Sequence, residues 1–234
     1  GGGCRTVIDL VTDARSNGIQ AYGLVDRDVL LGDQNWLLWW ECADQTFSLA
    51  RPYGAHIRVL LRWELENYLL DPDTMRIEAN DEEMTSTHTA ESVLARCLGC
   101  ANELKDRAAA SIAARAENLT APAPGFGCNP LKVGAELTDA LHEFLRSKGL
   151  GDPVAAMIIA RERIDQFDAP TDRPHVRWER LLRILDGKAA LKYISRQMGV
   201  RFDERRAALA RRMYERGTVP AEIRGYIDEF KGAI

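Results

Sequence analysis

The first part of the chain alternates between a helical pattern and short apolar runs. Residues 5–17 place their apolar side chains on one side of a predicted helix, and Asn-Gly at 17–18 is a common helix end. Two apolar runs follow, at 20–26 and 56–61, and each predicts a buried strand. Between them, residues 29–50 hold three tryptophans and predict a short helix or an insertion packed on the sheet. Helix followed by strand indicates half of a βαβ unit.

From about residue 73 onward the pattern is helical throughout. A Pro- and Gly-rich segment at 120–130 predicts a loop. The predicted fold class is α/β, with a parallel sheet flanked by helices over residues 1–73 and a mostly helical region over residues 74–234. The helices expected in the second region are 74–79, 89–118, 131–148, 153–167, 174–198, 202–216 and 220–231.

The chain opens on three glycines that lead directly into the first helical pattern. A tag remnant is one explanation. We prefer another, because a parallel sheet with only two clear strands is small for a stable domain. We therefore expect the sequence to begin inside a longer protein, with one strand missing upstream.

Composition excludes several classes of protein. Hydrophobic residues make up 46% of the chain and charged residues 28%, which is typical of soluble globular proteins. No apolar run approaches the roughly 18 residues that span a bilayer, so we expect no membrane partner. The five cysteines are scattered and odd in number, which favours free thiols in a reducing cytosol.

Charge is distributed unevenly along the chain. The net charge is −4, yet residues 173–216 hold 13 Lys or Arg against 5 Asp or Glu. Residues 64–91 hold nine acids and one base. An acidic site beside this basic arm, 173–216, is a charge layout typical of enzymes that act on phosphodiesters. The alternative is that the arginine-rich helices only form a solvated surface.

Two acidic clusters follow the two predicted strands. Asp26 and Asp28 come directly after the first, and residues two apart in an extended segment share a face. Carboxylates at the C-terminal ends of parallel strands lie where α/β sheets place their active sites. Mg²⁺ and Mn²⁺ prefer such oxygen ligands. The alternative is that these aspartates cap a turn or a helix.

The second cluster is Glu64-Leu-Glu66-Asn67. If it continues the strand, both glutamates face the metal site; if it is helical, only one does. We expect Glu66 to be the metal ligand, with Glu64 as the second choice. Asn67 would add an amide oxygen or hold a water molecule. Alternatively, Glu64 pairs with a nearby arginine on the surface.

These segments resemble the TOPRIM nuclease domain of the OLD (overcoming lysogenization defect) type. Gly-Leu-Val-Asp-Arg-Asp at 23–28 is similar to a family strand ending in "vDrD", and Glu-Leu-Glu-Asn-Tyr-Leu-Leu-Asp-Pro at 64–72 is similar to a following segment that reads "iEnYLL". The glycines at 1–3 resemble the second strand and turn of the family. Leu-Asp-Gly-Lys at 185–188 is weakly similar to a "GK" that opens a late helix. The resemblance is close over about residues 1–73.

The resemblance implies that Asp26 and Asp28 are the metal-binding pair and that Glu66 is the glutamate before Asn-Tyr. It also implies control by an ATPase domain or subunit, and a role as an effector of bacterial anti-phage defence. TOPRIM domains carry a further glutamate after their first strand. No residue before Gly1 is given, so we expect that glutamate upstream; otherwise the chain is not fully active.

Basic residues supply the remaining candidates. We expect Arg205, Arg206, Arg211 and Arg212 to face solvent and contact nucleic-acid phosphates. Lys188 follows a glycine near a predicted helix start, where an ammonium could stabilise charge on the scissile phosphate. The alternative for Lys188 is an exposed solubilising group.

Other motifs favour structural roles. Trp178 falls on the apolar stripe of its predicted helix, so we expect it in the core. Cys97 and Cys100 share the apolar face of the 89–118 helix and lack two further zinc ligands at a recognisable spacing, so we expect them in the core as well. We expect His88 on a surface loop.

We therefore expect a cytoplasmic, Mg²⁺- or Mn²⁺-dependent nuclease that cleaves phosphodiester bonds of DNA or RNA. The catalytic residues would be Asp26, Asp28, Glu66 and Lys188. The alternative is a catalytically inactive TOPRIM-like module that binds nucleic acid or a partner ATPase through its basic arm. A primase or topoisomerase fragment would share the acids, but the chain shows no nucleotide-binding element. A homo-oligomer is compatible with each reading.

Overall fold

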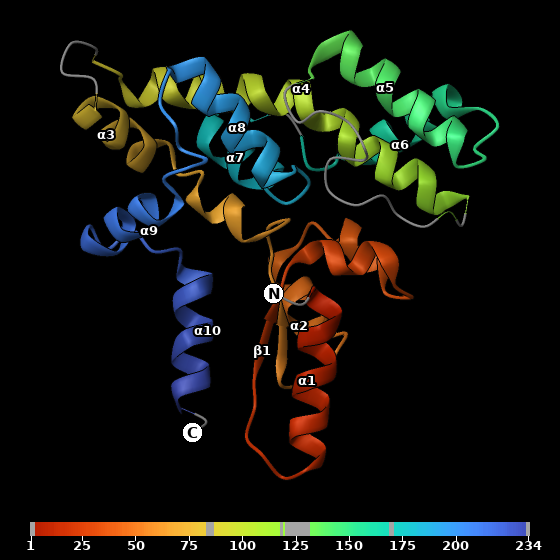
Figure 1. The fold of residues 1–234 in the computed structure, drawn as a ribbon, viewed down its shortest axis with the longest axis vertical. Coiled ribbons are helices and arrows are strands. Elements are labelled where there is room, and N and C mark those ends of the chain that lie inside the picture. Colours follow the sequence, from red (N-terminus) through yellow and green to blue (C-terminus); the bar gives the residue numbers. More distant parts are fainter. Residues whose placement is uncertain (1–2, 83–86, 118, 120–131, 169–170, 233–234) are drawn as a thin grey trace.

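A two-stranded parallel sheet lies beside the first helix of the chain in this computed structural model (Figure 1). The structure describes residues 3–82, 87–117, 119, 132–168 and 171–232. Strand β1 (Gly23–Val25) pairs with β2 (Ile57–Val59), with Gly23 opposite Ile57 and Val25 opposite Val59. Both strands are shorter than the sequence predicted. Of the three N-terminal glycines, Gly3 is described, and residues 1–2 lie outside the described residues. The loop predicted at 120–130 lies outside them as well.

Helix α1 (Cys4–Ser16) packs along β1, as Figure 1 shows. Its close approach depends on Gly23. A Cβ at that position would lie 3.1 Å from methyl groups of both Val7 and Val11. The helix ends at Ser16, and Asn17 is its C-cap, so the predicted helix and its end signal are confirmed.

The insertion between the strands is built from short helices. These are the 3-10 helices η1 (Arg27–Gly32) and η2 (Trp36–Trp40), followed by α2 (Asp44–Ala50). Trp39 is fully buried and meets the buried Trp63 edge-on, with ring centroids 4.8 Å apart. The predicted short helix is confirmed, and its aromatic side chains pack against the segment that follows β2.

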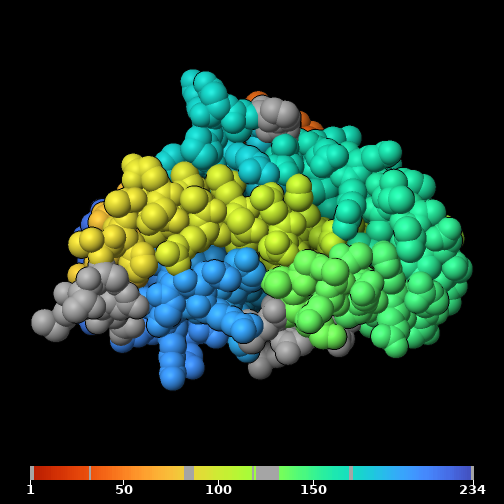
Figure 2. All heavy atoms as spheres, turned by 90° about the horizontal axis from the view of Figure 1, so that it is seen from above, coloured from red at the N-terminus to blue at the C-terminus, as the bar shows by residue number. Residues whose placement is uncertain are grey.

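The second half is helical, and α4 (Ala90–Ala116) is its central element. Figure 2 shows α4 in yellow and yellow-green, between α6 and α7 in teal on one side and α8 and α5 on the other. The remaining elements are η3 (Leu65–Leu69), α3 (Pro72–Glu82), α5 (Gly134–Ser147), α6 (Pro153–Ile164), α7 (Pro174–Leu181), α8 (Gly187–Met198), α9 (Arg206–Glu215) and α10 (Ala221–Gly232).

The prediction of one continuous helix over residues 174–198 is wrong. Residues 174–198 form two helices, α7 and α8, rather than one. The first helix ends at Leu181, and the second begins after Asp186, whose carboxylate accepts a 2.9 Å hydrogen bond from the backbone N–H of Ala189 and so caps α8. An N-cap residue has extended backbone geometry, so the helix cannot run through it. The start of α8 at Gly187 also sets the position of Lys188.

The predicted combination of a parallel sheet and a helical region is confirmed at this coarse level. Buried side chains of both halves belong to one continuous hydrophobic cluster, which reaches from Val11 beside the sheet to Leu209 in α9. The boundary near residue 73 stays a prediction. Within the described part of the chain, no helix is both long and apolar enough to cross a bilayer.

Candidate metal centre

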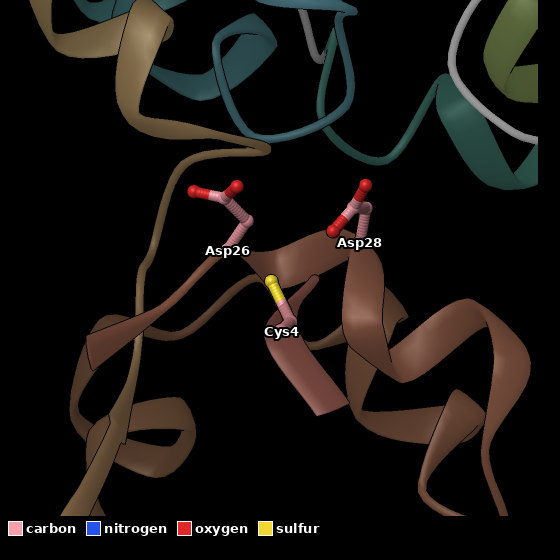
Figure 3. A group of neighbouring side chains, drawn as sticks. All are labelled: Cys4, Asp26 and Asp28. Atoms are coloured by element: carbon pink, nitrogen blue, oxygen red, sulfur yellow. The ribbon is translucent and has the colours of Figure 1, made fainter. Parts of the chain in front are cut away.

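Two carboxylates and a thiol converge where β1 ends and α1 begins. One oxygen each from Asp26 and Asp28 and the sulfur of Cys4 all lie within 4.8 Å of one another. Figure 3 shows the three side chains on neighbouring ribbons, the two aspartates on the segment that follows β1 and Cys4 at the start of α1. Among the residues that the structure describes, this is the one group of three or more potential metal ligands at such spacing.

The parallel pairing of the strands accounts for this convergence. At the ends of the strands the two segments stay side by side: the backbone N–H of Leu60, just after β2, donates to the carbonyl oxygen of Val25 at 3.0 Å. The backbone N–H of Leu65 then donates to Oδ1 of Asp26, also at 3.0 Å. The two acidic clusters predicted from sequence therefore meet at the C-terminal edge of the sheet.

Arg27 separates the two aspartates by turning inward. Its guanidinium is buried and donates to the carbonyl oxygens of Leu61 at 2.7 Å and Trp39 at 2.6 Å, and it lies 4.1 Å from the ring centre of Phe47. Burial lowers the pKa of Arg27 to about 9. Since Arg27 uses its donors inside the core, neither aspartate gains it as a counter-ion.

Both aspartates ionise less readily than ordinary carboxyl groups. Burial, followed by the negative charge of Asp26, raises the pKa of Asp28 to about 6. Burial also raises the pKa of Asp26, against the opposing effects of the Leu65 hydrogen bond and the positive charge of Lys188. A divalent cation between two such carboxylates would remove this repulsion. The oxygen donors therefore fit Mg²⁺ or Mn²⁺.

Sequence reasoning missed Cys4, which it treated as one of several free thiols. Burial raises the pKa of this thiol, so the free side chain is neutral. A topological signal was present. A helix that connects two parallel strands runs antiparallel to them, so its first residue lies at the edge where the strands end. Helix α1 precedes β1 and packs along it, so its first residue, Cys4, lies at the end of the sheet where Asp26 follows β1.

Glu64 does not join this group. It is the N-cap of η3 and forms a capping box with Asn67, in which the Glu64 carboxylate accepts from the Asn67 backbone. The same carboxylate accepts a 2.8 Å hydrogen bond from the backbone N–H of Lys188 and an ion pair from the Lys188 ammonium. Burial raises the pKa of Glu64 to about 7. With three donors on its carboxylate, Glu64 is left out of the ligand set that we propose below.

Glu66 lies in η3 beside the aspartates but is held by two cations. Arg206 donates to its Oε1 at 2.6 Å, and the ammonium of Lys188 is 3.5 Å from its Oε2. Its negative charge raises the pKa of both Asp26 and Asp28, although burial is the larger cause. The structure thus places Glu66 in the electrostatic field of the pair but outside the 4.8 Å group.

The four arginines predicted to contact phosphates differ in their surroundings. Arg206 pairs with Glu66, as described above. Arg205 and Arg212 both bind the buried carboxylate of Glu78 in α3, at 2.7 and 2.8 Å. Arg211 is 80% exposed and contacts Glu215 one helical turn away. Only Arg211 therefore matches the expectation of an open, solvent-facing guanidinium; the other three also connect α9 and the residue before it to acidic side chains.

The core positions expected for Trp178, Cys97 and Cys100 are confirmed. Trp178 is buried and donates a 2.9 Å hydrogen bond from its indole to the carbonyl oxygen of Leu70. Cys97 and Cys100 are buried within α4. His88 differs in part from its expectation, because it is half-buried rather than on the surface, and its backbone N–H donates to the side chain of Asn80 at 2.7 Å. It lies in the segment between α3 and α4, as expected of a loop residue.

Comparison with known proteins leaves the site to be interpreted from its own geometry. The chain matches no protein-family model, no curated protein and no solved structure.

Proposed function

We propose that the chain binds a divalent cation, Mg²⁺ or Mn²⁺, through Asp26 and Asp28 and hydrolyses phosphodiester bonds of DNA or RNA. The observation that carries this proposal is the convergence of two partly desolvated carboxylates at the C-terminal edge of a parallel sheet. Such an arrangement is costly without a cation, and the guanidinium nearest in sequence is used elsewhere. The similarity of residues 23–28 and 64–72 to the OLD-type TOPRIM pattern supports the same chemistry.

The roles of the protein groups follow from their positions. A bound cation would polarise the phosphate and generate the attacking hydroxide at neutral pH. Asp26 and Asp28 hold that cation. Lys188 presents an ammonium that is half exposed, beside Glu66 and Asp26, where it can contact a non-bridging phosphate oxygen. Glu66 lies at the same acidic edge and would be available as a further ligand if its contact with Arg206 were broken.

The biological setting rests on the resemblance alone. We propose that an ATPase, as a domain of the same protein or as a separate subunit, controls the nuclease in bacterial anti-phage defence. Residue 211 and its neighbours in α9 would contribute phosphate contacts for the nucleic acid.

One observation favours a second candidate function. Glu66 has cations on both carboxylate oxygens, Arg206 on one and Lys188 on the other. A site whose acidic residues are neutralised by protein cations needs no metal for charge balance. The chain would then be a catalytically inactive module that binds nucleic acid or a partner ATPase.

Cleavage assays separate the two functions. Labelled single-stranded DNA, duplex DNA and structured RNA are incubated with the parent chain, Asp26→Asn and Asp28→Asn, each with Mg²⁺, Mn²⁺ or EDTA. The nuclease proposal expects cleavage by the parent with Mg²⁺ or Mn²⁺ and none by either variant. Equal cleavage by parent and Asp26→Asn would remove these acids from the catalytic centre. Metal-independent binding without cleavage would favour the inactive module.

A further inference from the structure

The side chain of Glu64 is the most deeply buried of the acidic side chains around the centre. It is 1% exposed, and its carboxylate accepts from three donors. Two of these belong to Lys188, its backbone N–H at 2.8 Å and its ammonium. The third is the backbone N–H of Asn67. One carboxylate therefore binds the first turn of α8, the Lys188 side chain and the first turn of η3.

Helices η3 and α8 are in close contact at Asn67 and Gly187. The side chain of Asn67 donates to the carbonyl oxygen of Leu185 at 2.9 Å and accepts from the backbone N–H of Glu64 at 3.0 Å. A Cβ on Gly187 would lie 2.5 Å from Oδ1 and 2.8 Å from the backbone nitrogen of Asn67. Glycine is thus the residue that lets α8 begin against η3, directly before Lys188.

Lys188 differs from Glu64 in its exposure. Its side chain is 48% exposed, and the ammonium reaches Glu66 at 3.5 Å as well as Glu64. A long, flexible side chain at a half-exposed position would normally sample many rotamers. Here the buried carboxylate holds the backbone of Lys188 and the end of its side chain at once, so the ammonium stays at the open edge of the acidic cluster.

We infer that Glu64 is a positioning residue: it fixes the ammonium of Lys188 beside Asp26 and Glu66, where a substrate phosphate would be contacted, and does not itself bind the metal. This inference rests on the proposed nuclease function for its catalytic consequence. The geometric part, that Glu64 holds Lys188, stands independently of it. Two experiments on the full chain test the two parts separately.

The geometric part is tested by acylation of lysines in the metal-free chain, followed by mass spectrometry. Lys192, exposed one turn later in α8, is the internal reference. We expect Lys188 to react several-fold more slowly than Lys192 in the parent, and the rates to converge in Glu64→Gln, whose amide presents a donor in place of one carboxylate oxygen. Equal rates in the parent, or an unchanged Lys188 rate in Glu64→Gln, would overturn the inference.

The matched control is Asp168→Asn. Asp168 is a similarly enclosed carboxylate, 9% exposed, that accepts from the ammonium of Lys105 at 2.6 Å. Its substitution should speed acylation of Lys105 and leave Lys188 unchanged. A general loosening of the fold would instead raise the Lys188 rate in both variants, and the inference would then fail.

The catalytic part is tested by a double-mutant cycle on cleavage. Glu64→Gln should lower kcat by about 10- to 100-fold, the effect of a small misplacement of a catalytic group, with KM nearly unchanged. In a Lys188→Met background the same substitution should lower kcat no further, because its effect passes through Lys188. A further loss of 10-fold or more in that background would mean that Glu64 acts directly, as a metal ligand would. If the parent cleaves nothing, the proposed function fails, while the acylation rates still decide whether Glu64 holds Lys188.

Discussion

Leu65 and Asp26 lie 39 residues apart in the chain, and the backbone N–H of Leu65 donates a 3.0 Å hydrogen bond to Oδ1 of Asp26. This contact ties the segment after β2 to the acidic segment after β1. The hydrogen bond uses only Oδ1, so the other carboxylate oxygen of Asp26 does not accept from Leu65. The strand ends are therefore held together by the backbone of one segment and a side chain of the other, with Asp28 close by.

Asp28→Asn should stabilise the metal-free chain at alkaline pH. The pKa of Asp28 is about 6 in the folded chain and near the ordinary 3.8 when unfolded, so the folded state binds this proton more tightly. The contribution of Asp28 to the free energy of unfolding is therefore greatest below about pH 4. It falls between about pH 4 and pH 6 and stays low above about pH 6. Two pH units correspond to roughly 3 kcal/mol. Urea unfolding at pH 4 and pH 8 should show a gain for the variant at pH 8 only; an equal gain at both would contradict the assignment.

Gly187→Ala should destabilise the chain and weaken cleavage together. The added Cβ would meet Asn67 at 2.5 to 2.8 Å, and overpacking of this kind costs about 1–3 kcal/mol. Gly99→Ala is the control, because Gly99 is inside α4 and a Cβ there would meet nothing within 4 Å. Thermal unfolding should show a lower Tm for Gly187→Ala and an unchanged or higher one for Gly99→Ala. A Gly187→Ala chain as stable as the parent would show that η3 and α8 do not need their close contact.

Arg212→Ala should lower stability, and Arg211→Ala should not. Arg212 binds the buried carboxylate of Glu78 at 2.8 Å and Asp81 at 2.6 Å, so its loss should cost about 1–3 kcal/mol. Arg211 is exposed, and exposed pairs contribute little. Chemical denaturation compares the two variants. Equal stabilities would mean that the Glu78 contacts are weak and that Arg212 is a surface residue, as the sequence predicted.

Arg211 is also the sharper test of nucleic-acid binding. If it contacts a phosphate, Arg211→Ala should weaken binding and reduce the slope of log affinity against log salt by about one. Binding to a labelled oligonucleotide at several salt concentrations measures this slope. An unchanged slope would leave Arg211 as part of the solvated surface.

The sequence predicted those features that depend on local pattern. Apolar runs located β1 and β2, and their acidic ends identified Asp26 and Asp28. Helical periodicity located most of the helices. The break before Lys188 was missed because buried apolar residues continue across it, from Leu181 and Leu185 to Ala189, although Asp186 before Gly187 is a local N-cap signal.

Long-range pairing was beyond the sequence. Glu64 and Lys188 are separated by 124 positions, and no local sequence pattern predicts that they interact. The same holds for Arg206 and Glu66, separated by 140 positions, so guanidinium groups that looked free have carboxylate partners. Cys4 was missed for a different reason: its position followed from the direction of α1 relative to the strands, a topological argument rather than a motif.

The central claim is that Asp26 and Asp28 hold a divalent cation, and Mn²⁺ binding to the full chain tests it most directly. Electron paramagnetic resonance reports free Mn²⁺ during a titration. The account predicts saturable binding by the parent, its loss in Asp26→Asn and in Asp28→Asn, and retention within a few-fold in Cys4→Ser, because hard cations prefer oxygen ligands. Competition by Mg²⁺ should displace the bound ion. Saturable binding of equal affinity in the parent and in the Asp26→Asn, Asp28→Asn double variant would contradict the claim.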